Sequence, residues 1–174
     1  GRVLKDGDII AVDVCVSLDE HIGDNCRTVP VGSVSPEVDR LLKVTEEAMY
    51  CGIEQAVHGN QVGDVSNAVQ RCVEKAGFAV ITNFVGHGVG KSLHEEPQIP
   101  NYGRPRSGPR LKRGLTVAIE PMVNMRIKDI RMADDGWTAL AVDNMPSAHF
   151  EHTVMIGNDQ AEILTIPEGA ESSK

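Results

Sequence analysis

Residues 8–18, which read DIIAVDVCVSL, alternate between an aliphatic face and a less aliphatic one. A period of two is typical of a strand with one side on a core. Asp13 lies in the middle of the less aliphatic face, although Asp and Glu are depleted in strands and are rarely buried unpaired. The aliphatic face consists of Ile10, Val12, Val14, Val16 and Leu18. The pattern therefore predicts a sheet in which this carboxylate needs a compensating partner.

Three further carboxylates occupy the same kind of position. A strand at 23–31 contains Asp24, and a hairpin turn centred near residues 18 and 19 would place Asp24 directly opposite Asp13. Glu120 and Glu151 lie on the less aliphatic faces of two more predicted strands, at 115–121 and 149–157. Any one of these could be a solvated carboxylate at a sheet edge. Burying all four requires cations, and the chain supplies too few nearby Lys or Arg side chains.

Two divalent metal ions, about 3.5–4 Å apart, would balance such a group of carboxylates if one imidazole completed the ligand set. The segment VGHGVGKSLHEEP, residues 85–97, contains two candidates, His87 and His94. Its glycines predict a loop that backbone and ligand can approach closely. One histidine would be the nitrogen ligand and the other would act on the substrate. Spacing alone leaves open which of the two does which.

The rest of the chain predicts an α+β fold. Apolar residues recur at helical spacing in 36–56, after an N-cap at Ser35 and a proline at the first helical position. A second helix is expected at 64–76, ending at Gly77, followed by a short strand at 79–81. The 174 residues are sufficient for one domain, which we expect over 1–174 with a polar tail at 167–174.

The composition argues against some classes of binding partner and indicates a cellular location. A net charge of −8 argues against a nucleic-acid or anionic-membrane surface. No apolar run approaches the roughly 20 residues that span a bilayer. The four cysteines form no C-x-x-C pair, which favours free thiols in a reducing compartment and hence a cytoplasmic location.

Six short motifs, taken in order, resemble those of the type I methionine aminopeptidases, and the likeness extends from about residue 4 to 165. They are VDV at 12–14, GDN at 23–25, GHGVGKSLHEEP at 86–97, IEPM at 119–122, DGW at 135–137 and FEHT at 150–153. The resemblance implies a pita-bread fold and hydrolysis of N-terminal methionine from peptides and nascent proteins by a metal-activated water.

The resemblance also implies roles for individual residues. The catalytic residues would be His94, which contacts substrate near the scissile amide, and Glu120, a ligand that also shuttles a proton. Trp137 would lie near the methionine pocket, as would Leu93, where the family often has an aromatic residue. His152 is expected to be structural on the opposite face, and His21, His58 and His149 to be loop or surface residues. Five metal ligands are implied: Asp13, Asp24, His87, Glu120 and Glu151, with Asp24 and Glu151 bridging two ions whose identity among Co, Mn, Fe and Zn is open.

Two other functions share this fold. Prolidases and proline-specific aminopeptidases use the same ligand types, but IEPM and the nearby DGWT favour the methionine enzyme. A pita-bread binding protein without catalysis would lose ligands, whereas all five are present. Contact with the ribosome is left open, and a complete chain is expected to be a monomer.

The chain is expected to lack part of its fold. The pita-bread fold is pseudo-symmetric, yet only one pair of helices is predicted, and no counterpart precedes the strand at 8–18. The fold class is therefore α+β pita-bread without its N-terminal helices. We expect an exposed aliphatic sheet surface, or a second polypeptide that covers it.

Overall fold

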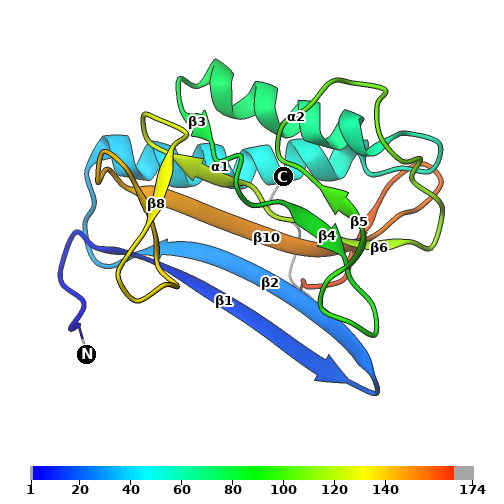
Figure 1. The fold of residues 1–174 in the computed structure, drawn as a ribbon, viewed down its shortest axis with the longest axis horizontal. Coiled ribbons are helices and arrows are strands. Elements are labelled where there is room, and N and C mark those ends of the chain that lie inside the picture. Colours follow the sequence, from blue (N-terminus) through cyan, green and yellow to red (C-terminus); the bar gives the residue numbers. More distant parts are fainter. Residues whose placement is uncertain (1, 167–174) are drawn as a thin grey trace.

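The computed structural model describes residues 2–166, and its centre is a nine-stranded antiparallel sheet (Figure 1). Six of its strands lie side by side in the order β1-β2-β10-β6-β4-β5. They span Ile9–Leu18 (β1), His21–Pro30 (β2), Ser147–Met155 (β10), Thr116–Ile119 (β6), Gly86–Gly88 (β4) and Glu95–Ile99 (β5). The expected polar tail at 167–174 lies outside the described residues.

The shorter strands complete this arrangement. β11 (Glu162–Ile163) and β7 (Met122–Asn124) pair with β10, and β3 (Ala79–Val80) pairs with β7. A separate hairpin consists of β8 (Ile130–Met132) and β9 (Ala139–Ala141). Because β10 lies between β2 and β6, it joins strands from the beginning and the middle of the chain.

The two predicted helices are present and pack on one side of the sheet (Figure 1). α1 spans Pro36–Gln55, and the Ser35 hydroxyl accepts a hydrogen bond from the backbone N–H of Val38 at 3.3 Å. α2 spans Val62–Lys75, two residues earlier than expected, because the Asp64 carboxylate accepts from the backbone N–H of Gln61 at 2.8 Å.

The hydrophobic core lies between these helices and the sheet. Along β10 and β6, every second side chain faces α1, and the side chains between them face away from it. The alternation seen in the sequence therefore separates an apolar layer from a polar face. The buried core includes Leu41, Met49, Ile53, Val65, Val69, Val117, Ile119, Phe150 and Val154.

The register of the β1–β2 hairpin differs from the expectation by two residues. Asp13 lies opposite Cys26, and Asp24 lies opposite Cys15. The reason is the turn, which is centred one residue later, on Asp19 and Glu20, both with positive φ (47° and 62°). That conformation is the two-residue turn that best matches strand twist. A shift of two keeps the parity, so both carboxylates still share one face.

The aliphatic face of β1 does not lie on a core in this chain. Val12, Val14, Val16 and Leu18 are 48, 49, 59 and 76% exposed. Of the two sequence expectations for this face, a covered core is wrong and an exposed aliphatic surface is confirmed. Among the strands, helix α1 contacts mainly β10, so the β1–β2 hairpin extends beyond the helical layer (Figure 1).

Candidate metal centre

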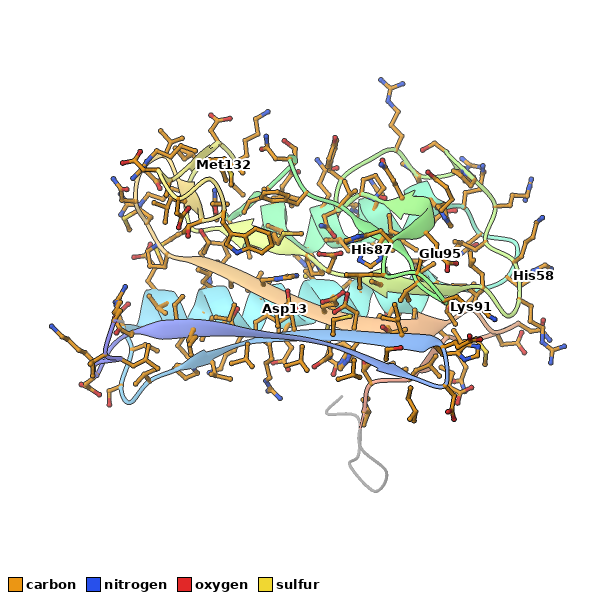
Figure 2. The ribbon with its side chains drawn as sticks, turned by 60° about the horizontal axis from the view of Figure 1, so that its bottom comes forward. Asp13, His58, His87, Lys91, Glu95 and Met132 are labelled. Carbon is orange, nitrogen blue, oxygen red and sulfur yellow. The ribbon has the colours of Figure 1, made fainter. Side chains whose placement is uncertain are left out.

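The face of the sheet that points away from α1 and α2 collects polar side chains from four strands. Asp13 on β1 and His87 on β4 lie on the same side of the β1–β2 hairpin (Figure 2). Glu151 on β10 lies opposite Cys26, which in turn lies opposite Asp13. Glu120 directly follows β6 and is next to Glu151 if the register of β10 and β6 continues by one residue.

Short distances join the buried members of this group. His87 Nε2 lies 3.3 Å from Glu120 Oε1 and 3.9 Å from Asp24 Oδ2. Asp24, His87 and Glu151 each offer one donor atom within 4.8 Å of the other two. The strand order therefore brings Asp24, Glu120 and Glu151 together with one imidazole. Asp13 shares their face but is exposed, and its carboxylate lies close to Cys26 and His149.

The buried carboxylates of this group repel one another, and a cation would relieve that repulsion. Burial raises the pKa of Glu151 to about 9, and the carboxylates of Glu120, Asp24 and Asp13 add to the rise. Burial, followed by the charge of Asp13, also raises the pKa of Asp24. The nearby basic side chain of Arg27 pairs instead with Glu46 of α1, on the other side of the sheet. Divalent metal ions would stabilise the ionised carboxylates.

His87 presents one ring nitrogen to the carboxylates. Its Nδ1 lies 2.9 Å from the backbone oxygen of Gly88, which can only accept a hydrogen bond. Nδ1 therefore carries the proton, and Nε2 offers its lone pair toward Asp24 and Glu120. A backbone acceptor on the second nitrogen is the usual way to fix the tautomer of a metal-ligating histidine.

The glycines around His87 allow close packing of backbones. The expected loop is in fact the three-residue strand β4, held between β5 and β6. A Cβ on Gly86 would lie 2.4 Å from the backbone oxygen of Ala118, and one on Gly88 would lie 2.4 Å from that of Glu96. Any larger residue would push β4 out of the sheet and move His87.

Gly88→Ala is therefore expected to lower the free energy of unfolding by about 1–3 kcal/mol, because the added methyl group meets fixed backbone. Urea denaturation measures the change. Gly23→Ala on β2 is the matched control, since a Cβ there has only an ordinary contact at 4.0 Å. Equal stability of the Gly88 variant and the wild type would contradict the close approach.

The residues expected to contact substrate differ in their exposure. The ring of His94, in the loop between β4 and β5, lies edge-on to His87 with centroids 4.4 Å apart, and His94 is exposed. Leu93 is half-buried. Trp137 lies in the turn between β8 and β9 and is 87% exposed, so it lines no closed pocket among the described residues.

One histidine lies where it was not expected. His149 was predicted to be a loop or surface residue, but it lies on β10 with its imidazole Nε2 3.4 Å from Glu120 Oε2. Its side chain is only 19% exposed. The alternation of side chains along a strand could have predicted this position. His149 is two residues from Glu151 on β10, and Cys26 is two residues from Asp24 on β2. Both therefore point to the polar face.

The other three histidines follow the predictions. His152 lies on the opposite face of β10, where its ring is 6.0 Å from that of Tyr50 on α1. Burial lowers the pKa of His152 to about 4. His21 and His58 are exposed, at the start of β2 and in the loop after α1. None of these three contributes to the polar face.

The raised pKa of Glu151 predicts how the stability of the metal-free protein depends on pH. With a folded pKa of about 9 and an ordinary value of 4.5, this carboxyl keeps its proton in the folded state and loses it in the unfolded chain. The free energy of unfolding therefore falls as pH rises between these values. His152 titrates below pH 6.5 and does not mask the effect above it. We expect a loss of up to about 1.4 kcal/mol per pH unit from pH 6.5 upward.

Urea denaturation of chelator-treated protein at successive pH values tests this expectation. Glu151→Gln should flatten the profile, because the amide does not titrate. A saturating divalent ion should flatten it as well, because the ion stabilises the carboxylate. A profile that is already flat in the metal-free wild type would contradict the assigned burial and charge of Glu151.

Comparison with known proteins gives a consistent picture. Residues 1–158 match Metallopeptidase family M24. The chain is 48% identical over 164 residues to methionine aminopeptidase 1 of Bacillus subtilis and 47% identical over 163 residues to methionine aminopeptidase of Clostridium perfringens. Each match covers 94% of this chain and 66% of the relative, so the chain spans about two thirds of their length.

Solved structures agree with the fold. The crystal structure of methionine aminopeptidase from Thermotoga maritima has a TM-score of 0.93 at 46% identity, covering 95% of this chain and 67% of that one. Prolidase from Pyrococcus furiosus, at 23% identity and a TM-score of 0.75, shares the fold over 95% of this chain and 43% of its own. The expected α+β pita-bread fold is thus confirmed, and the chain belongs to metallopeptidase family M24.

Proposed function

We propose that this chain is the catalytic domain of a methionine aminopeptidase, acting on peptides and nascent chains that begin with methionine. The observation that carries the proposal is the convergence of Asp24, His87 and Glu151, with Glu120 beside them, on one buried polar face. Relatives of 41–48% identity that are named methionine aminopeptidases support the substrate class.

The donor set fits divalent metal ions, as membership of the metallopeptidase family implies. The site combines carboxylate oxygens with one imidazole whose lone pair faces them, and its pKa shifts indicate negative charge in need of compensation. We propose that two ions would be held there; Co, Mn, Fe and Zn all suit such ligands. The proposed ligands are Asp13, Asp24, His87, Glu120 and Glu151.

When bound, the ions would supply an acidified water and a Lewis acid for the scissile carbonyl. Glu120 then acts as proton carrier, taking the proton of the water at a carboxylate oxygen and passing it to the leaving amine. His94 donates a hydrogen bond to the substrate as negative charge develops on the carbonyl oxygen. Leu93 and Trp137 are proposed to contact the methionine side chain.

The runner-up is a proline-specific peptidase. Its support is weaker, because prolidases and X-Pro peptidases resemble this chain at only 18–23% identity, which shows the fold alone. A binding protein without catalysis is disfavoured by the presence of every ligand-type side chain at the centre.

A direct comparison of two substrates tests the proposal. Purified protein is given a Met-Ala-Ser peptide or an X-Pro peptide, each with Co²⁺ or Mn²⁺ and each with a chelator. We expect free methionine only from the first peptide and only with metal. Faster cleavage of the X-Pro peptide would favour the runner-up, and no cleavage of either with metal bound would favour a binding protein.

The residue after the methionine should have to be small. This expectation rests on the resemblance to the methionine aminopeptidases, in which a bulky second side chain would clash when the substrate lies extended beside the metal ligands. A clash of about 1.4–3 kcal/mol corresponds to a loss of roughly 10–150-fold in kcat/KM for a Met-Arg peptide relative to a Met-Ala peptide. Measuring both rates with the same preparation is sufficient, and equal rates would contradict this expectation.

A further inference from the structure

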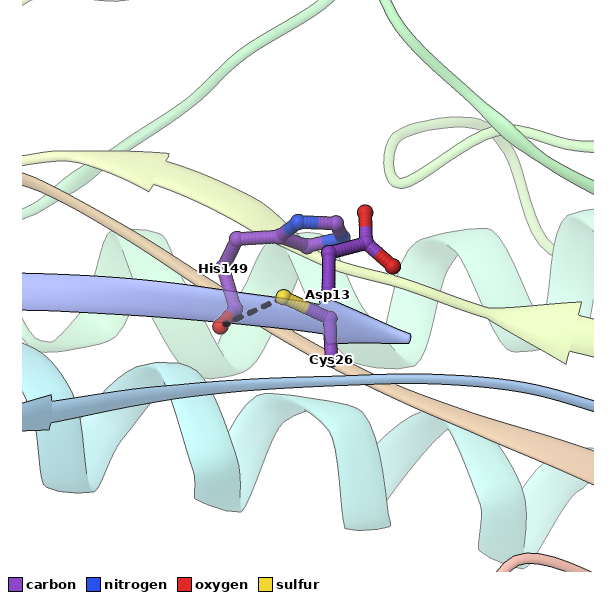
Figure 3. A group of neighbouring side chains, drawn as sticks. All are labelled: Asp13, Cys26 and His149. Atoms are coloured by element: carbon purple, nitrogen blue, oxygen red, sulfur yellow. Dashed lines mark hydrogen bonds between the residues drawn. The ribbon is translucent and has the colours of Figure 1, made fainter. Parts of the chain in front are cut away.

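We propose that Asp13, Cys26 and His149 form a second cation site, containing sulfur, that takes a thiophilic divalent ion such as Zn²⁺ or Cd²⁺. The three side chains converge from β1, β2 and β10 (Figure 3). The site borders the buried group of Asp24, His87 and Glu151. It shares Asp13 with the proposed peptidase ligands and adds Cys26 and His149, which no step of the proposed reaction requires.

The geometry is close to that of a metal site. Asp13, Cys26 and His149 each offer one donor atom within 4.8 Å of the other two. In a tetrahedral zinc site with bonds of about 2.0–2.3 Å, neighbouring donors are about 3.3–3.7 Å apart. Side-chain rotations that move each donor atom by less than about 1 Å would bring the three donors from their present spacing to that of a zinc site. The strand backbone, paired on both sides of β2, need not move.

An unsatisfied nitrogen is a second, independent sign of a ligand. His149 Nε2 is buried and has no hydrogen-bond partner among the described residues. Glu120 Oε2, at 3.4 Å, is near it but does not form a hydrogen bond with it. A buried polar atom without a partner destabilises a fold, because it has given up its hydrogen bond to water. A metal ion at this position would satisfy that nitrogen.

The thiol of Cys26 is also weakly engaged. It is 2% exposed, and the one hydrogen bond that it forms among residues 2–166 is a long one, 3.8 Å to the backbone oxygen of His149 (Figure 3). Cys26 lies directly between Asp13 and Glu151 across the sheet. Sulfur together with imidazole selects softer ions than carboxylates alone do.

Charge favours an ion at this point. Cys26 lies between Asp13 and Glu151 across the sheet, so that a carboxylate stands on either side of it. Two negative charges next to the sulfur attract a divalent cation. When the ion binds, the S–H bond of Cys26 breaks, a sulfur–metal bond forms and the proton leaves to solvent.

The chain offers a matched control cysteine. Cys15 lies on the same polar face, opposite Asp24, but it is exposed and belongs to no group of three donors among the described residues. Cys51 and Cys72 lie on α1 and α2, away from this face. A signal that depends on Cys26 and not on Cys15 would therefore report the proposed site.

The experiment is a Cd²⁺ titration followed by thiolate-to-cadmium charge-transfer absorption in the ultraviolet. Carboxylates and imidazole give no such band, so ions in the peptidase centre are silent. In protein with Cys15, Cys51 and Cys72 replaced by serine, we expect the band to saturate with one Cys26-bound Cd²⁺ per chain, in addition to any Cd²⁺ that the peptidase centre takes up silently. Cys26→Ser should abolish the band, and His149→Gln should weaken the Cd²⁺ binding that the band reports by at least ~10-fold.

Single variants of the otherwise unchanged protein cover the case in which the triple serine variant does not fold. There, Cys26→Ser should remove band intensity that Cys15→Ser leaves in place. The reverse pattern, or a Cd²⁺ affinity unchanged by His149→Gln, would overturn the proposal. So would the absence of a Cys26-dependent band in protein that still releases methionine with Mn²⁺, and that result would leave the proposed peptidase function intact.

Discussion

His94→Ala is expected to lower kcat for a Met-Ala-Ser peptide by about 10²–10³-fold, the usual effect of removing one donor to a developing oxyanion. The metal content should stay the same. His94 is exposed at the edge of the centre, and its ring contacts His87 rather than the carboxylates. Rates and metal stoichiometry are to be measured on the same preparation, because partial metal loss would imitate a catalytic defect.

The control for this variant is His21→Ala, which removes an exposed histidine at the start of β2. It should leave kcat and metal content unchanged. If His94→Ala instead lost metal to the same degree as a ligand variant, the assignment of His87 as metal ligand and His94 as substrate contact would be wrong.

His87→Ala should have the larger effect, because it removes the only nitrogen donor in the group with Asp24 and Glu151. We expect the affinity for divalent metal ions to fall by at least ~10²-fold. This change corresponds to a loss of about 2.7 kcal/mol of binding free energy. At low metal concentration the release of methionine should be undetectable. Calorimetric titration with Mn²⁺ measures the affinity directly, and an unchanged affinity would contradict the role of His87 as a ligand.

Much of this centre was predictable from alternation alone. Asp24, Glu120 and Glu151 were assigned to the less aliphatic side of their strands, and the structure places all three on one buried face. The β1–β2 register differs from the expectation by two residues, but the predicted face is still correct. Side chains alternate between the two faces of a strand every second residue, so a shift of two leaves each side chain on the same face. The turn conformation at Asp19 and Glu20, which sets the register, has no strong signature in those residue types.

Other parts depended on tertiary structure. β4 is three residues long and exists because β5 and β6 hold it on both sides, so its glycines looked like a loop in the sequence. The expectation that His149 is a loop or surface residue is wrong, because His149 lies two residues before Glu151 on β10 and therefore faces the same side of the sheet. Local sequence indicates which face a residue occupies, but strand order decides which residues meet on that face.

The exposed aliphatic side of β1 has the same explanation. Val14 and Val16 show the alternation of a half-buried strand, yet they are 49% and 59% exposed. Periodicity reports that a face is suited to burial and does not report what covers it. Among residues 2–166, α1 covers β10, and no described helix reaches the far side of β1.

Anomalous diffraction from crystals soaked with Mn²⁺ is the most direct test of the central claim. The account predicts two peaks, about 3.5–4 Å apart, between the strands that supply the carboxylates and the imidazole. Their ligands should be Asp13, Asp24, His87, Glu120 and Glu151. Manganese held by a different set of side chains would contradict the assignment of this face as the catalytic centre.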